Sequence, residues 1–162
     1  GAVSRSAQDF VTEVWPHALE ASRRTGIPAE FMVAQAALET GWGQKQLRHA
    51  DGSPSNNLFN IKAGSAWSGR SVAREVTEYA DGQAYTESAR FRSYASYAES
   101  FRDYANLITR SPRYAEVLGQ TDAAAFARGL QDAGYATDPM YADKLTRIIG
   151  GNTLRSALAM AG

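Results

Sequence analysis

Residues 27–43 read IPAEFMVAQAALETGWG, and this stretch is apolar on almost every face until its end. Such a pattern predicts a helix over about 28–40 that is buried on most sides, with Pro28 in its first turn and Gly41 after its end. Glu39 then lies in the last turn, where the negative end of the helix dipole disfavours a carboxylate. Apolar neighbours and this dipole both raise the pKa of a carboxyl group, so Glu39 is a candidate general acid. The simpler interpretation is a partly exposed Glu that pairs with a nearby Arg or Lys.

Length and charge limit the partners that the chain can have. Its 162 residues suit one domain, with a core over about residues 8–150. The 17 basic and 17 acidic side chains cancel, so nucleic acid is not an expected partner. No apolar run approaches the ~20 residues that a membrane span requires. We expect a monomeric single domain over residues 1–162, excised from a longer protein.

The sequence offers little to a metal ion or a cofactor. Cys is absent, which excludes thiolate ligands and a Cys nucleophile. His17 and His49 lie far apart, so a His-based metal site and a Ser-His-Asp triad are both poorly supported. We expect no metal and no cofactor, and the remaining chemical groups are carboxylates, tyrosines and amines.

Most of the chain has helical periodicity, with one β-hairpin between helices. Turn formers fill residues 48–57 and predict a loop. Asp81-Gly82 is a strong two-residue hairpin signal between two stretches of period two. Caps and periodicity predict strands at 71–80 and 83–92, helices at 6–26, 96–111, 111–118, 121–134 and 138–150, and a weak or frayed helix after 152. The predicted class is α+β.

The hairpin turn determines which side chains share a face. With Asp81-Gly82 as the turn, Glu78 pairs with Tyr85 and shares its face with most of the larger apolar groups. Glu78 is therefore a second candidate carboxylate, and Glu87 on the same face competes with it. The simpler interpretation of Glu78 is an edge charge that resists aggregation.

Aromatic and amide side chains recur beside glycines and turns. A sugar ring has an apolar face and a rim of hydroxyl groups, which suits aromatic planes set among amides. Anchoring of the core and the loops is the simpler interpretation for most of them. The candidate substrate-binding residues are Trp42, Asn57, Asn60, Trp67, Tyr85 and Tyr141.

Five stretches of the sequence, in order over about residues 8–150, carry a family resemblance. They are AQAALETGWGQKQL, NNLFNIKA, VTEYADGQ, ARFRSYASYAESFRDYANLITRSPRY and LQDAGYATDPMYADKL. Together they resemble glycoside hydrolase family 73, the bacterial N-acetylglucosaminidases, in the form of the peptidoglycan hydrolase domain of a flagellar protein. The resemblance implies a lysozyme-like α+β fold, with a mainly helical lobe and a small β-hairpin lobe (about 65–92) over a substrate cleft.

The resemblance also implies an activity and a place in the cell. The expected reaction is hydrolysis of the β-1,4 bond between N-acetylglucosamine and N-acetylmuramic acid in peptidoglycan. Glu39 falls on the family's general acid, Glu78 on its second acidic residue and Tyr135 on a functionally important tyrosine. Segment 56–62 falls on a substrate-side segment, in which Asn60 stands where many members have Gly. The implied location is the periplasm, where the enzyme opens the wall for the flagellar rod, and rod components are expected partners of an absent N-terminal region.

The same residues leave several mechanisms open. Glu78 either activates the attacking water or steadies the substrate's own N-acetyl group during substrate-assisted attack. A lytic transglycosylase needs no second carboxylate, and a non-catalytic glycan-binding module would tolerate loss of Glu39. Because a two-stranded hairpin is marginally stable alone, we expect it to be displaced outward without substrate. The two carboxyl groups would then be more than roughly 6.5–9.5 Å apart.

Overall fold

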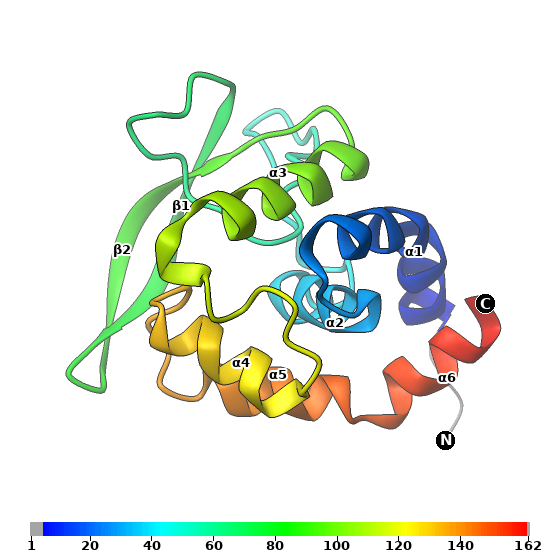
Figure 1. Ribbon diagram of the computed structural model, residues 1–162. Coiled ribbons are helices and arrows are strands. Elements are labelled where there is room, and N and C mark those ends of the chain that lie inside the picture. The colour runs from blue at the N-terminus through cyan, green and yellow to red at the C-terminus, as the bar shows by residue number, and fades with distance from the viewer. Residues whose placement is uncertain (1–4, 162) are drawn as a thin grey trace.

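The computed structural model describes residues 5–161, which form a helical body and one β-hairpin (Figure 1). The α+β class is confirmed. None of the helices in this range has the length and apolarity that a bilayer crossing needs. The helices are α1 (Arg5–Thr25), α2 (Ala29–Thr40), α3 (Tyr97–Arg110), the 3-10 turn η1 (Pro112–Tyr114), α4 (Ala123–Asp132), α5 (Tyr141–Ile149) and α6 (Asn152–Ala161), and the strands are β1 (Ser71–Ala80) and β2 (Gln83–Arg92).

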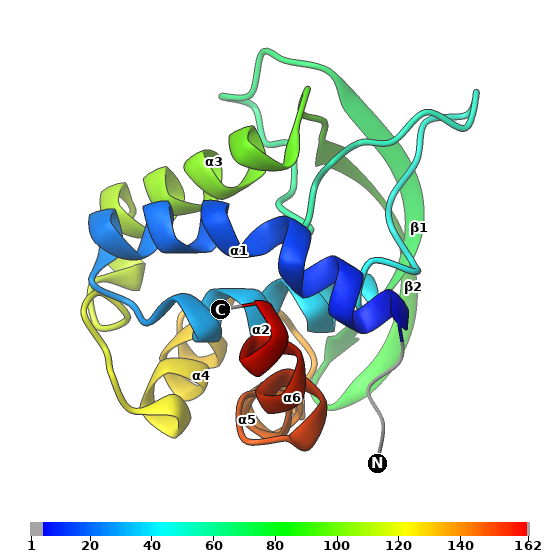
Figure 2. The same ribbon diagram turned by 90° about the vertical axis from the view of Figure 1, so that its right-hand side faces the viewer.

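Helix α2 is the centre of the helical body. Its side chains are buried along most of its length, as the apolar sequence predicts. Helix α1 packs against α2, α3 and α6, and α5 packs against α2 and α4. Figure 2 shows α2 between α1 on one side and α4, α5 and α6 on the other. Because α2 is packed on both sides, its C-terminal end has a fixed place in the fold.

The stretch Gly41-Trp42-Gly43 ends α2 sharply, two residues after Glu39. Gly41 adopts the left-handed conformation, and the backbone N–H of Trp42 donates to Ala37 O at 2.9 Å. At Gly43, φ is 85° and a Cβ atom would lie 2.8 Å from the ring of Phe10. The chain can therefore turn away from α2 and pass close to α1 only with glycine at this position.

The predicted hairpin is confirmed in its bounds and its register. Glu78 lies opposite Tyr85 in an antiparallel pair of ten-residue strands. Asp81 and Gly82 have φ values of 51° and 77°, as the type I′ turn that suits twisted strands requires. The face that carries Glu78 is therefore the one that the turn predicted.

The base of the hairpin is fixed to the rest of the molecule. Val72 and Phe91 are buried together with Leu47 in a small second core. The backbone N–H of Arg92 donates to Ile61 O at 3.0 Å, which joins β2 to the segment that precedes the hairpin. The hairpin therefore has packing and hydrogen bonds that an isolated pair of strands lacks.

Two predicted helices differ from the structure. The helix over 111–118 is wrong: only η1 forms, and turns follow it. The helix predicted from Asp138 begins at Tyr141, because Asp138 first closes a turn in which its Oδ1 accepts from Met140 N at 2.8 Å. The weak C-terminal helix is confirmed as α6, which packs on α1.

Candidate active site

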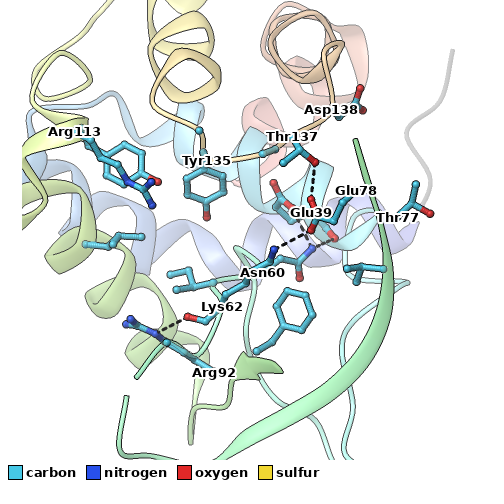
Figure 3. A pocket seen from close by; sticks show the side chains of 18 residues that line it. Glu39, Asn60, Lys62, Thr77, Glu78, Arg92, Arg113, Tyr135, Thr137 and Asp138 are labelled. Carbon is cyan, nitrogen blue, oxygen red and sulfur yellow. Dashed lines mark hydrogen bonds and ion pairs between the residues drawn. The ribbon is translucent and has the colours of Figure 1, made fainter. Parts of the chain in front are cut away.

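A cleft of about 550 Å³ is lined by both the hairpin and the helical body (Figure 3). Its walls come from the end of α2, residues 60–64, the two strands, residues 107–114 and residues 134–138. These segments are distant in the sequence. The cleft therefore exists only in the folded chain, and both candidate carboxylates line it.

Glu39 lies in this cleft, mostly buried, with a donor at each carboxyl oxygen. The Tyr141 hydroxyl donates to Oε2 at 2.8 Å, and Asn60 Nδ2 donates to Oε1 at 3.0 Å. Burial raises the pKa of Glu39 to about 7, although the two hydrogen bonds lower it. The carboxyl group can therefore hold a proton near neutral pH, as a general acid must.

Asn60 reaches Glu39 because its backbone adopts the left-handed conformation, with φ of 50°. Asn is one of the few residues besides Gly that occupy this region readily. Its Nδ2 also donates to the backbone carbonyl of Glu39 at 3.1 Å. Asn60 thus adds two hydrogen bonds to the end of α2.

Glu78 enters the cleft from β1 and differs from Glu39 in its partners. Lys62 Nζ lies 2.9 Å from Oε1, and the Thr137 hydroxyl donates to Oε2. Partial burial acts to raise the pKa of Glu78, but the hydrogen bonds from Thr137 and Lys62, with the charge of Lys62, outweigh it and lower the pKa. The cleft therefore holds one carboxyl group that favours the acid form and one that favours the ionised form.

The hairpin is engaged with the helical body, so the expectation of an outward displacement is wrong for this structure. The backbone N–H of Tyr79 donates to Thr137 Oγ1 at 2.9 Å, and Thr137 donates to Glu78. Both bonds join the strand to the segment between α4 and α5. Figure 3 shows Thr137 directed toward the Glu78 carboxyl group. The prediction treated the hairpin as unsupported, whereas Thr137 holds it near its tip.

Tyr135 also lines the cleft, from the segment between α4 and α5. Its hydroxyl donates to Phe59 O at 2.6 Å, and its ring stacks near that of Tyr141, with centroids 6.1 Å apart. Burial raises the pKa of Tyr135 well above its usual range, so the hydroxyl remains neutral. Because its proton is used on Phe59, the hydroxyl can offer only lone pairs to a bound group.

Asn60 is confirmed as a residue that lines the cleft, but Asn57 and Tyr141 lie behind its surface. Asn57 is buried, and its amide donates to Ile61 O and Arg92 O, so it joins the turn at 57–61 to β2. Tyr141 is buried and acts on Glu39. The polar atoms of these two residues are used inside the protein, and direct substrate binding by them stays a prediction.

Trp42, Trp67 and Tyr85 are also not among the residues that line the cleft. Trp42 packs against the main core. Trp67 donates from its indole to Arg70 O at 2.8 Å, and the Arg92 guanidinium covers its ring at 4.9 Å. Tyr85 is 45% exposed on the hairpin. Two of these rings are thus used in packing and the third lies outside the cleft, and their role as substrate platforms stays a prediction.

Sequence reasoning missed Lys62 and Thr137, the two partners of Glu78. Lys62 ends the NNLFNIK stretch, and Thr137 lies within GYATD, so each belongs to a stretch already singled out. No periodicity or spacing indicates that they meet a hairpin strand. Their contacts with Glu78 span 16 and 59 residues of sequence and are visible only in the fold.

Known proteins are similar in sequence to this chain over most of its length. Residues 15–154 match the glucosaminidase family, described as mannosyl-glycoprotein endo-beta-N-acetylglucosaminidase. The chain is 49% identical over 140 residues to the peptidoglycan hydrolase FlgJ of Escherichia coli (strain K12), which covers 86% of this chain and 45% of that protein. The chain thus spans less than half the length of this relative.

Solved structures share the fold as well. A crystal structure of a peptidoglycan hydrolase from Sphingomonas sp. A1 is 54% identical, with a TM-score of 0.87, and the match covers 96% of this chain and 95% of that one. The glycoside hydrolase domain of FlgJ from Salmonella typhimurium is 41% identical, with a TM-score of 0.73 and coverage of 95% and 92%. By sequence and by fold, this chain belongs to the glucosaminidase family.

Proposed function

We propose that this chain hydrolyses peptidoglycan at the β-1,4 bond between N-acetylglucosamine and N-acetylmuramic acid. Membership of the glucosaminidase family and similarity to proteins named peptidoglycan hydrolases support the proposal. The observation that carries it is the pair of cleft carboxyl groups, with the pKa of Glu39 raised to about 7 and that of Glu78 lowered. One protonated and one ionised carboxyl group at the same pH is the arrangement that glycoside hydrolysis uses.

Glu39 is the proposed general acid. It donates its proton to the glycosidic oxygen as the bond from that oxygen to the anomeric carbon breaks, so the leaving sugar departs as a neutral alcohol. After the transfer Glu39 is a carboxylate, and the hydrogen bonds from Tyr141 and Asn60 then favour its charge. The same two donors that hold the acid in place thus stabilise the product form of its carboxyl group.

Glu78 is the proposed partner carboxylate, in one of two roles. As a base it takes a proton from water while the water oxygen attacks the anomeric carbon. In the substrate-assisted route the N-acetyl oxygen makes that attack, and Glu78 accepts a hydrogen bond from the amide N–H. Lys62 and Thr137 favour the ionised Glu78 that both routes need. Tyr135 orients the sugar or the water by accepting a hydrogen bond on its hydroxyl oxygen.

The proposed place of action is the periplasm, because the proposed substrate is the cell wall. Opening of the wall for the flagellar rod, and rod components as partners of the whole protein, are part of the same proposal and rest on the sequence resemblance. A monomer remains our expectation for the domain, since one chain supplies each residue of the proposed mechanism.

The test is to identify the reducing-end sugar that the chain releases. Purified peptidoglycan is digested, reduced with borohydride and analysed by mass spectrometry. Reduced N-acetylglucosamine is the expected product. Reduced N-acetylmuramic acid would show a muramidase, anhydro ends would show a lytic transglycosylase, and binding without any new ends would show a glycan-binding module.

A further inference from the structure

A line of buried hydrogen bonds leads from the interior of the helical body to Glu39. Tyr104 of α3 donates to Gln35 Oε1, and Gln35 Nε2 donates to the Tyr141 hydroxyl oxygen at 2.9 Å. Tyr141 in turn donates to Glu39 Oε2 at 2.8 Å. Gln35 and Tyr104 are both 0% exposed. We refer to Tyr104, Gln35 and Tyr141 as the relay.

Gln35 is an unusual residue for its position. It lies one turn before Glu39 on the same face of α2, among side chains that are otherwise apolar and buried. A buried amide destabilises the fold unless its donors and acceptors are paired. Gln35 has partners on both its oxygen and its nitrogen. Its hydrogen bonds connect α3 through α2 to the first residue of α5.

The relay has a direction because each hydroxyl group carries one proton. In the arrangement described, each of the three members donates toward Glu39 and Oε2 accepts. In the reverse arrangement Glu39 would have to be protonated and donate to Tyr141, which would donate to Gln35, which would donate to Tyr104. The Tyr104 proton would then need another acceptor, and no other hydrogen-bond partner of that hydroxyl lies within residues 5–161. A buried donor without a partner is costly, so Tyr104 favours the direction toward Glu39.

The direction determines where the acid keeps its proton. While Tyr141 donates to Oε2, the carboxyl proton must occupy one of the other lone pairs of Glu39, and Glu39 lines the cleft. In the reverse arrangement the proton lies between Oε2 and Tyr141, which does not line the cleft. There it faces the protein interior and is not available to a glycosidic oxygen.

We propose that Tyr104 and Gln35 are positioning residues that direct the Tyr141 proton toward Glu39 and so keep the transferable proton of Glu39 on the cleft side. This proposal rests on the proposed role of Glu39 as the general acid. Neither residue lines the cleft, so both act through Tyr141.

The groups that face Glu39 limit what else can shift its titration. They are Tyr141 on α5, Tyr104 on α3, Tyr135 on the segment before α5, and Asn60. The charged side chains that line the same cleft are Glu78, Lys62, Arg92, Arg113 and Asp138, and Glu78 pairs with Lys62. A change at Tyr104 or Gln35 leaves that ion pair in place, so a changed titration of Glu39 reports on the relay.

The test is Tyr104→Phe, which removes one hydroxyl group and keeps the ring that stacks on Phe59. Without Tyr104 the direction toward Glu39 leaves the Gln35 oxygen without a donor, so the two directions differ less in free energy and protonated Glu39 donates to Tyr141 in more of the molecules. We expect kcat for reducing-end release to fall, by at most the about 10-fold that one net buried hydrogen bond is worth. KM should be unchanged, and the basic limb of the kcat–pH profile should move to higher pH.

Tyr97→Phe is the matched control. Tyr97 lies on the same helix, its hydroxyl accepts from the Gln46 amide at 2.7 Å, and it is not among the cleft residues. This variant also loses one tyrosine hydrogen bond, outside the relay, and should keep the wild-type kcat and pH profile. Gln35→Met removes the acceptor that the reverse direction needs for the Tyr141 proton. Combined with Tyr104→Phe it should therefore move the kcat–pH profile back toward that of the wild type.

The outcomes separate the relay from the proposed function. Wild-type kcat and an unmoved basic limb in folded Tyr104→Phe would overturn the relay, even with Glu39→Gln inactive and the function intact. A loss of kcat in Tyr97→Phe equal to that in Tyr104→Phe would also overturn it, since any lost hydroxyl would then have the same effect. Full activity of Glu39→Gln would instead refute the acid assignment, and the relay with it.

Discussion

Replacing Glu39 with Gln should raise the free energy of unfolding, relative to wild type, more at high pH than at low pH. The pKa of Glu39 rises from 4.5 in an unperturbed carboxyl group to about 7 in the folded protein. Between these pH values the native state holds a proton that the unfolded chain has released. The free energy of unfolding therefore falls as pH rises through this window.

The magnitude follows from the width of the window. A pKa difference from 4.5 to about 7 corresponds to about 3 kcal/mol of lost stability above pH 7, and to none below pH 4.5. Gln cannot ionise, so Glu39→Gln does not carry this loss. The amide nitrogen that this change introduces would be a donor that faces another donor, either Asn60 Nδ2 or the Tyr141 hydroxyl. That mismatch costs the same at every pH and cancels when two pH values are compared.

The assay is urea denaturation at pH 4 and pH 8. Relative to wild type, Glu39→Gln should gain about 3 kcal/mol between the lower and the higher pH. Glu87→Gln is the control, because Glu87 is a half-exposed hairpin carboxylate with only a 3.8 Å contact to Lys62. An equal stability difference between Glu39→Gln and wild type at both pH values would show that the pKa of Glu39 is not raised by folding.

The remaining predictions concern the other groups of the cleft. Glu78→Gln should lower activity about 100-fold, the size of a lost base, whereas Glu87→Gln should have little effect; equal losses would indicate general negative charge instead of one placed carboxylate. Thr137→Val removes a donor that lowers the pKa of Glu78, so the acid limb of the pH profile should move to higher pH; an unmoved limb would count against this. Activity should survive exhaustive EDTA treatment, because no group of three or more His, Cys, Asp or Glu within residues 5–161 is placed to hold a metal ion; loss with recovery on adding Zn²⁺ or Ca²⁺ would contradict this.

The features that local chemistry determines could be predicted from the sequence. The bounds of α2 follow from its apolar run, and Gly41 marks its end. The register of the hairpin follows from Asp81-Gly82, because the turn type sets the pairing on both sides. Glu39 was identifiable because a carboxyl group at the end of an apolar helix has no ordinary reason to be there. Its raised pKa agrees with that reasoning.

The features that depend on long-range contacts could not be predicted. Tyr141 and Asn57 are of residue types that often bind sugars, but in the fold their polar atoms form hydrogen bonds inside the protein. The packing of α5 on α2 decides where the Tyr141 side chain points, and the closing of the turn at 57–61 on β2 decides it for Asn57. The spacing of residues in the sequence reveals neither contact. Thr137 holds the hairpin across 59 residues of sequence. The prediction of an outward hairpin rests on the low stability of an isolated hairpin. In the fold the hairpin is not isolated, because Thr137 bonds to it near its tip.

Loss of the Glu39 proton should nearly abolish the release of N-acetylglucosamine reducing ends, so this release is the most direct test of Glu39 as the general acid. Wild type and Glu39→Gln are incubated with the same purified peptidoglycan, with the folded state of both checked by circular dichroism. Reduced N-acetylglucosamine ends are then counted by mass spectrometry. Glu39→Gln should release them at least ~100-fold more slowly, as loss of a general acid predicts. Release at a rate close to wild type from a folded Glu39→Gln would contradict the account.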